Sequence, residues 1–190
     1  MLNQNTNYDV NLPLGPELGG PLFFAHYSFL GLDPRNLTDH FANYWEQNVN
    51  HTKINYAYCV DNPKQYQGYG ANCWGLTASY SVDFYSAHAP TNDLGIISPT
   101  AALSSYPYMP KESMEMLRWM LEEHEEQLWK KYGFIDAFSL EHDWYSDGFL
   151  AIDQGPIIIM IENHRTGLLW RHFMSAPEIQ KGLKALGIEY

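Results

Sequence analysis

The sequence predicts an all-α protein whose helices are joined by long loops. Apolar residues recur at helical spacing in several segments, and no run alternates apolar and polar residues over a convincing strand length. Gly and Pro gather between the helical segments. Hydrophobic residues make up 45% of the 190 residues, enough for a packed core. We therefore expect residues 1–190 to form a single domain piece.

Charge and hydropathy exclude several classes of protein. The chain has 11 Lys and Arg against 22 Asp and Glu, a net charge of −11, and so acidic a surface repels a phosphate backbone. Nucleic acid is therefore not expected as a partner. The longest purely apolar run, Ile157–Ile161, is too short to span a membrane. No basic segment followed by an apolar one opens the chain, so no signal peptide is expected.

The N-terminal third is expected to begin irregularly and then to form a helix. Asn, Gly and Pro dominate residues 1–18. Asp33 followed by Pro34 is typical of a helix start, with Asp33 as the cap. Apolar spacing then continues the helix to Tyr58, and Pro63 predicts its end.

The middle and C-terminal parts differ in character. Residues 63–110 are rich in Gly and Pro and leave room only for short helices, at 74–80 or 99–105. A loop-rich stretch of this length is more often functional than idle. Long helices are predicted over 111–131, with a solvated acidic face and an end at Gly133, and from Asp153 onward, with Pro156 in the first turn. The expected buried stripe of this last long helix is Ile157, Ile158, Ile161, Leu168 and Leu169, and a short helix over 177–186 follows.

The cysteines and histidines suggest neither a disulfide framework nor a metal site. Cys59 and Cys73 are the only cysteines, and their spacing matches no zinc motif, so we interpret them as buried free thiols. The eight His are scattered, and no phosphate-binding or nucleophile motif is present. No cofactor and no metal are expected.

Aromatic residues stand among amides and carboxylates in four loop clusters. Rings can cover the apolar faces of sugars, while amides and carboxylates pair with their hydroxyls. This composition favours a carbohydrate cleft. The alternative, for each ring taken alone, is a place in the core. The clusters cover residues 26–27, 44–48, 69–74 and 142–145.

Two acidic residues are candidates for catalysis. Asp153 lies at the predicted start of the last long helix, where the positive end of the helix dipole is expected to lower its pKa and make it a base or an acceptor. Its alternative role is a plain helix cap. Glu162 stands three residues before Arg165, so a structural ion pair is the simpler explanation. Neither residue by itself supplies the two opposed carboxyl groups of glycoside hydrolysis.

Several blocks resemble one known family. The sequence is similar to the glycoamylase-like domain family, which includes endo-β-1,2-glucanases and is related to part of the cyclic β-1,2-glucan synthases. The resemblance is carried, in order along the chain, by Gly19–Pro34, Tyr44–Asn48, Asn72–Ser79, Pro99–Ser105, Ala151–Pro156 and Met160–Asn163.

The resemblance implies a fold and a missing part. It implies an (α/α)6 toroid with the sugar site in the loops at one end, of which this chain would be the C-terminal half. It also implies that the main catalytic acids lie in the N-terminal half. Ala71 departs from the family, whose members often carry Glu just before the Asn-x-Trp-Gly segment. Half a toroid would leave apolar helix surface exposed and invite self-association or a partner chain.

Two functional hypotheses follow from the resemblance and the loops. The first is a glycoside hydrolase acting on a bacterial β-glucan, for which a β-1,2 linkage is expected, by general acid and base chemistry, in the periplasm or outside the cell. The second is a non-catalytic carbohydrate-binding lobe, or a fragment that needs the missing half. The candidate catalytic residues are Asp153 and Glu162, and the candidate substrate-binding residues are His26, Tyr27, Trp45, Asn48, Asn72, Trp74 and His88.

Overall fold

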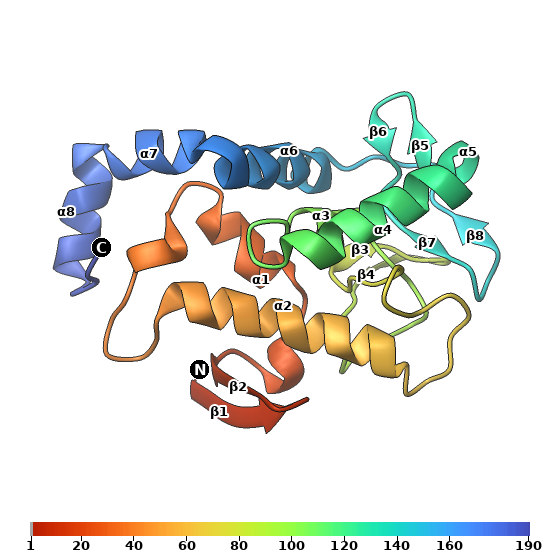
Figure 1. Cartoon of the computed structure of the whole chain (residues 1–190), viewed down its shortest axis with the longest axis horizontal. Coiled ribbons are helices and arrows are strands. Elements are labelled where there is room, and N and C mark those ends of the chain that lie inside the picture. Colours follow the sequence, from red (N-terminus) through yellow and green to blue (C-terminus); the bar gives the residue numbers. More distant parts are fainter. Residues whose placement is uncertain (1) are drawn as a thin grey trace.

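Helices dominate the computed structural model, which describes residues 2–190 (Figure 1). The three long helices are α2 (Tyr44–Asp61), α4 (Pro110–Glu123) and α6 (Ala151–Thr166). In Figure 1, α6 lies above α2, and α4 lies between them. The shorter helices are α1 (Phe23–His26), α3 (Pro99–Leu103), α5 (Glu125–Leu128), α7 (Leu168–Met174) and α8 (Pro177–Ala185), with 3-10 turns η1 (Glu17–Gly19), η2 (Tyr27–Phe29) and η3 (Pro34–Asn36). Within the described residues, no helix is long and apolar enough to cross a bilayer.

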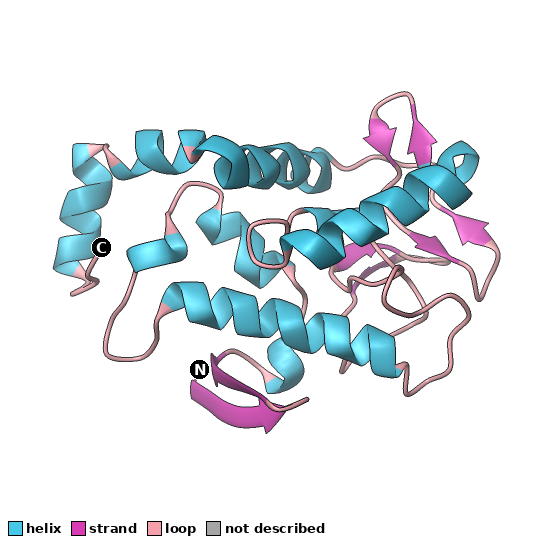
Figure 2. Cartoon of the chain, in the orientation of Figure 1, coloured by secondary structure: helices cyan, strands magenta, loops and turns pink. Residues whose placement is uncertain are grey.

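The expectation of an all-α chain was wrong in one respect, because four small antiparallel hairpins accompany the helices (Figure 2). Their strands have only two to six residues, too few for an alternating pattern to stand out. The first hairpin occupies the segment that was expected to be irregular, and it turns at Tyr8 and Asp9, both with positive φ. The pairs are β1 (Leu2–Asn7) with β2 (Val10–Leu14), β3 (Ala78–Tyr80) with β4 (Tyr85–Ala87), β5 (Trp129–Lys130) with β6 (Gly133–Phe134), and β7 (Phe138–Ser139) with β8 (Trp144–Tyr145).

Helix α2 begins later than predicted. Asp33 does cap a helical turn, accepting from Arg35 N, but that turn is only η3. A connection with a turn at Asp39–Ala42 follows, and Asn43, whose side chain accepts from Glu46 N, then starts α2. The predicted end before Pro63 is confirmed, because Asn62 adopts a left-handed conformation directly after α2.

The predicted helix over 111–131 is interrupted. Its backbone leaves helical geometry at His124, which separates α4 from α5. Trp129 begins a strand, and Gly133, with φ of 104°, begins strand β6 instead of ending a helix. The periodicity of this segment therefore predicted the first fourteen helical residues and missed a hairpin.

Helix α6 buries a different face from the one predicted. It begins at Ala151, which places Pro156 in its interior instead of its first turn. The expected isoleucine stripe is largely outside the core, and Ile158 is 72% exposed. Only four residues of α6 are buried: Asp153, Pro156, Met160 and Asn163.

The short helix α3 is the buried platform of the fold. All five of its residues are buried, and most are small. Gly75 packs so closely that a Cβ there would lie 2.8 Å from Ala101 Cβ, and its φ of 118° also requires glycine. Thr100 Oγ1 donates to Asp153 O at 2.7 Å, and Ser98 Oγ donates to Asp136 O at 2.7 Å. Helix α3 therefore brings the start of α6 together with the segment that precedes β7.

Candidate functional site

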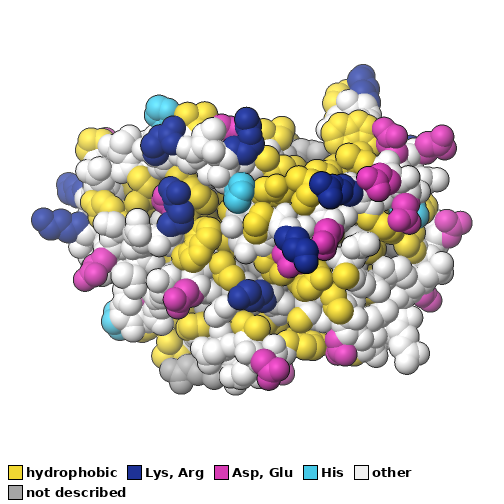
Figure 3. Space-filling model, in the orientation of Figure 1, with side chains coloured by type: hydrophobic (Ala, Val, Ile, Leu, Met, Phe, Trp, Pro, Cys, Tyr) yellow, Lys and Arg dark blue, Asp and Glu magenta, His cyan; other side chains and the backbone are white. Residues whose placement is uncertain are grey.

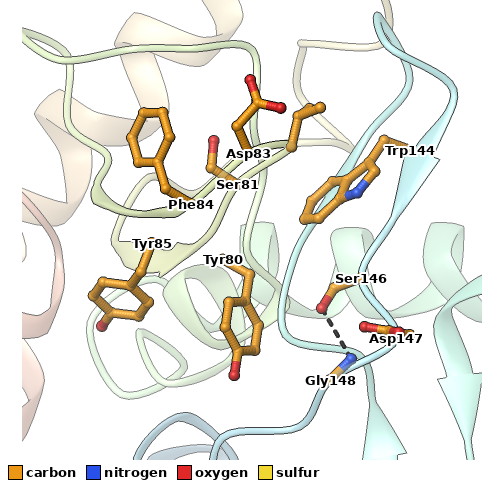
Figure 4. A pocket seen from close by; sticks show the side chains of 10 residues that line it. Tyr80, Ser81, Asp83, Phe84, Tyr85, Trp144, Ser146, Asp147 and Gly148 are labelled. Carbon is orange, nitrogen blue, oxygen red and sulfur yellow. Dashed lines mark hydrogen bonds between the residues drawn. The ribbon is translucent and has the colours of Figure 1, made fainter.

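A hollow of about 350 Å³ opens between the β3–β4 hairpin and the segment that follows β8 (Figure 4). We call it the hairpin hollow. In Figure 4, Trp144 lies on one side, and Phe84 and Tyr85 lie on the other. The lining residues are Tyr80, Ser81, Val82, Asp83, Phe84, Tyr85, Trp144, Ser146, Asp147 and Gly148.

The β3–β4 hairpin builds one wall of this hollow. Ser81 N donates to Phe84 O, which closes the tight turn between the strands. Tyr80 and Tyr85 are paired across the hairpin, with their rings edge to face and 6.2 Å apart. Gly148 forms part of the opposite wall, and a Cβ there would lie 2.6 Å from the Tyr80 ring. Glycine at 148 therefore lets the two walls approach.

The hollow combines flat rings with oxygen-bearing groups. Asp83 and Asp147 are exposed carboxylates, and Ser81 contributes a hydroxyl. Ser146 Oγ is partly used, since it accepts from Gly148 N at 3.1 Å (Figure 4). Aromatic faces beside hydroxyl and carboxylate groups suit a sugar, which presents C–H faces and hydroxyls together.

Two buried carboxyl groups lie behind the hairpin. Asp136 and Asp153 are each 1% exposed, and each carboxyl group lies close enough to shift the pKa of the other. Tyr80 N donates to Asp136 Oδ2 at 2.7 Å, and Tyr27 OH donates to Asp153 Oδ1 at 3.0 Å. We call these two residues the carboxyl pair. It connects η2, β3 and the first turn of α6.

The expected low pKa of Asp153 was wrong. Burial and then the neighbouring Asp136 raise its pKa to about 7, while the Tyr27 hydroxyl acts in the opposite direction. Burial also raises the pKa of Asp136. The first turn of a helix favours an ionised carboxylate by at most about 2 kcal/mol, which is less than desolvation beside a like charge costs. Asp153 is therefore suited to hold a proton.

Glu162 lies away from the carboxyl pair. It is nine residues after Asp153, two and a half helical turns, and so on the opposite face of α6. Arg165 Nη1 donates to Glu162 Oε2 at 2.7 Å, and Thr166 Oγ1 donates to Glu162 Oε1 at 2.6 Å. The structural ion pair, the simpler of the two explanations, is confirmed.

Of the candidate substrate-binding residues, the structure joins only Tyr27 directly to Asp153. His26 is buried, its Nε2 lies 2.8 Å from Ser105 Oγ, and burial lowers its pKa to about 3. Trp45 is half-buried and packs edge to face on Tyr108. The buried Asn48 donates to the Tyr108 hydroxyl at 3.1 Å.

Trp74 and His88 also lie inside the protein. Trp74 is 0% exposed in the largest core cluster, where its Nε1 donates to Glu112 O at 3.4 Å. His88 is buried, which lowers its pKa. Asn72 is exposed, in the tight turn between Gly70 and Cys73.

The structure does not bring His26, Trp74 and Asp153 to one hollow. All three side chains are buried, and none lines the hairpin hollow. For Trp74 and His26 a place in the core, the alternative considered from the sequence, is what the structure shows. Their segments still shape the region, because Leu22 N donates to Leu76 O and Phe23 N donates to Thr77 Oγ1.

Sequence reasoning passed over several residues of this region. Trp144 stood in a recognised aromatic cluster but was not selected. Tyr80, Tyr85 and Asp147 have ordinary local sequence contexts, and only the hairpin geometry collects them. Asp136 carried one weak signal, a single acid between two apolar pairs, Phe134–Ile135 and Ala137–Phe138.

Metal and thiol chemistry receive no support from the described part of the chain. No group of three or more His, Cys, Asp or Glu there is placed to hold a metal ion. Cys59 and Cys73 are free and buried, as predicted, and burial raises the pKa of the Cys59 thiol to about 12.

Comparison with known proteins decides the family. The family model described as "Putative glucoamylase" (Glycoamylase) matches residues 1–177. The chain belongs to this family. This match confirms the resemblance drawn from the sequence blocks of the glycoamylase-like chain.

Curated and solved relatives show what the chain is similar to. It is 50% identical over 186 residues to an exo β-1,2-glucooligosaccharide sophorohydrolase (non-reducing end) of Parabacteroides distasonis, covering 97% of this chain and 26% of that protein. Its structure matches the endo-β-1,2-glucanase of Chitinophaga pinensis, solved with sophorotriose and glucose, with a TM-score of 0.97 and 53% identity over 100% of this chain and 47% of that one. A glucoamylase-like protein of Bacteroides uniformis gives a TM-score of 0.97 and 58% identity over 99% and 46%. The chain therefore spans about a quarter to a half of these relatives.

Proposed function

We propose that this chain is the oligosaccharide-binding part of a β-1,2-glucan hydrolase. The observation that carries the proposal is the hairpin hollow, in which aromatic rings face carboxylate and hydroxyl groups. Two of the relatives named above are a β-1,2-glucooligosaccharide sophorohydrolase and an endo-β-1,2-glucanase, and the chain is 50% and 53% identical to them. The substrate is then a β-1,2-gluco-oligosaccharide, with Trp144 as a stacking ring and Asp147 as a hydroxyl acceptor.

The carboxyl pair is not suited to flank a glycosidic bond. Hydrolysis needs two carboxyl groups about 5 to 9.5 Å apart, with the sugar between them. Asp136 and Asp153 are neighbours, and each is only 1% exposed, so no sugar fits between them. We therefore infer that Asp153 supports the hairpin hollow from behind, through Asp136 and Tyr80, and that a second lobe supplies a catalytic acid.

An apolar groove along α6 supports this two-lobe arrangement. It measures about 450 Å³ and lies between α6, α4 and the β5–β6 hairpin. Hydrophobic side chains spread over this region in Figure 3. Its lining residues are Leu103, Leu117, Trp129, Tyr132, Gly133, Phe134, Gln154, Ile157, Ile158 and Ile161. Exposed apolar surface of this kind marks an interaction site. We infer that a second helical lobe covers it and completes an (α/α)6 toroid, in the periplasm or outside the cell.

Titration calorimetry with sophorotriose tests the binding proposal. The 190-residue chain is expected to bind sophorotriose in preference to β-1,3- and β-1,4-linked glucose trimers. Trp144→Ala should weaken binding about tenfold, because a stacking face is lost. Trp129→Ala is the matched control, since Trp129 is also a partly exposed tryptophan but lies outside the hollow. Equal binding by both variants, or no preference for the β-1,2 linkage, contradicts the proposal.

Release of reducing ends from β-1,2-glucan separates the enzyme from the binding lobe. Binding without turnover by the purified chain supports the lobe. Turnover that is lost in Asp153→Asn supports a complete local site and contradicts the two-lobe inference.

A further inference from the structure

The unused oxygens of the carboxyl pair are the starting observation. Asp136 Oδ2 accepts from Tyr80 N, and Asp153 Oδ1 accepts from Tyr27 OH. The other oxygens, Asp136 Oδ1 and Asp153 Oδ2, are buried and accept from no N–H or O–H group of the described residues. Two buried carboxylate oxygens without a donor are costly, and two adjacent carboxylates repel each other.

We propose that Asp136 and Asp153 share one proton between Asp136 Oδ1 and Asp153 Oδ2, and that this bond fixes the geometry of the hairpin hollow. The shared proton satisfies both unused oxygens and leaves a single negative charge on the pair. Asp136 and Asp153 are positioning residues in this scheme, since both are buried and neither touches the hollow.

Asp136 holds both walls of the hollow. Its carboxylate accepts from the backbone of Tyr80, on the β3 wall, and its own N–H donates to Gly148 O at 3.2 Å, on the opposite wall. The shared proton then ties Asp136 to Asp153 at the start of α6. Thr100 Oγ1 in turn donates to Asp153 O, which anchors this connection on α3.

The surroundings of the pair favour the shared proton. The titratable groups that act on it from neighbouring elements are Tyr27 of η2 and Tyr85 of β4, both neutral at ordinary pH. A positive charge would lower the pKa of either acid, and no lysine or arginine of the described residues is among the groups that shift it. The pKa of Asp153, about 7, leaves the proton in place below neutrality.

Loss of the proton has a definite consequence. A second negative charge would then be buried beside the first, and both unused oxygens would lack a donor again. We expect the Asp136–Asp153 contact to lengthen above about pH 7 and the two walls to lose their fixed spacing. The effect on sugar affinity rests on the proposed function, but the proton itself does not.

Infrared spectroscopy of the wild-type chain tests the proton directly. A carbonyl band of a protonated carboxyl group should be present at about pH 6, well above the ordinary carboxyl pKa near 4, and should disappear by about pH 9. Asp153→Asn and Asp136→Asn should each lack the band, while Glu122→Gln, an exposed acid on α4, should retain it. No band in the wild-type chain at pH 6 overturns the proposal, and this measurement does not depend on a variant that folds or on sugar binding.

The change of folding stability with pH gives a second test. The folded pKa of Asp153 is raised, so the folded chain holds a proton that the unfolded chain has lost between about pH 4 and 7. The unfolding equilibrium constant should therefore rise with pH in this window, by up to about tenfold per pH unit from this one proton, and level off above it. Asp153→Asn should lose this part of the slope. A slope equal to that of the wild-type chain overturns the proposal.

A measurement of sugar binding then separates the shared proton from the proposed function. If sophorotriose binds, its affinity should fall several-fold between about pH 6 and 8.5 in the wild-type chain and stay level in Asp153→Asn. Equal pH profiles would show that the pair does not position the hollow. Absence of binding at any pH, with the infrared band present, would contradict the proposed function and leave the shared proton established.

Discussion

Two of the long helices, α2 and α6, bury different kinds of side chain. Half of the eighteen residues of helix α2 are polar or charged, and four of its seven buried residues are polar: Asn48, His51, Thr52 and Asn55. Helix α6 contains four isoleucines in its middle, yet only four of its sixteen residues are buried, and none is isoleucine. Two of these polar side chains, His51 and Asn55, bond to the backbone of loops that cross α2. His51 Nε2, for example, lies 3.0 Å from Gly20 O.

The difference shows that hydropathy alone does not decide burial in this chain. The apolar surface of α6 is exposed in this chain, and we propose that a second lobe covers it. Helix α2 is already covered on several sides, by β2, η1 and η3 among others. Changes on the two helices should therefore have effects that differ from what hydropathy suggests.

The largest effect is expected at Met160, on the buried face of α6. Met160→Ala leaves a cavity next to Trp170 and Tyr108 and should reduce the free energy of unfolding by about 2–5 kcal/mol. Urea denaturation followed by tryptophan fluorescence measures it. A loss below about 1 kcal/mol would mean that this face of α6 is not part of the core.

A loss almost as large is expected from a polar residue of α2. Asn55 Oδ1 accepts from Leu76 N at 3.0 Å, and its Nδ2 donates to Leu76 O at 3.1 Å, all of them buried. Asn55→Ala leaves both backbone groups without a partner and should cost about 2–4 kcal/mol. Asn50→Ala on the same helix removes an exposed bond to Asn11 O and should cost less than about 1 kcal/mol. Equal losses would contradict the interpretation that α2 is buried through its amides.

A smaller effect is expected from the hydroxyl that joins η2 to α6. Tyr27→Phe removes the donor that favours ionised Asp153, so the pKa of Asp153 should rise further. The pH at which stability stops falling should then move upward by about one unit. Tyr44→Phe is the control, because it removes a comparable bond, from Tyr44 OH to Asp39 Oδ2, far along the chain from the pair. A downward shift in Tyr27→Phe would reverse the assigned role of the hydroxyl.

The smallest effect on stability is expected on the exposed face of α6. Ile158→Ala should change the free energy of unfolding of the isolated chain by less than about 0.5 kcal/mol, because the side chain is already in water. Ile158→Glu should in addition reduce self-association in analytical ultracentrifugation, since a charge enters the apolar groove. A large loss of stability in Ile158→Ala would remove the contrast between the two faces.

Much of the helical framework could be predicted from the sequence. The end of α2 before Pro63, the first part of α4, the short helix at 99–103 and the helix at 177–185 were expected from apolar period and from Gly and Pro. The family was recognised from residue blocks spread over the chain, and the family model confirms it. The hairpins were missed because strands of two to six residues carry no readable period.

The sequence by itself determined that helices and aromatic loops would form, because helical period and turn residues act over a few neighbours. It also identified Asp153 and Tyr27 as residues of interest. Only the tertiary structure decided the partners: Asp136 lies 17 positions from Asp153 and Tyr27 lies 126. Bonds from Ser98 and Thr100, at the start of α3, hold the backbones of Asp136 and Asp153. Burial beside a like charge then reversed the direction expected for the pKa of Asp153, because desolvation depends on the complete three-dimensional surroundings.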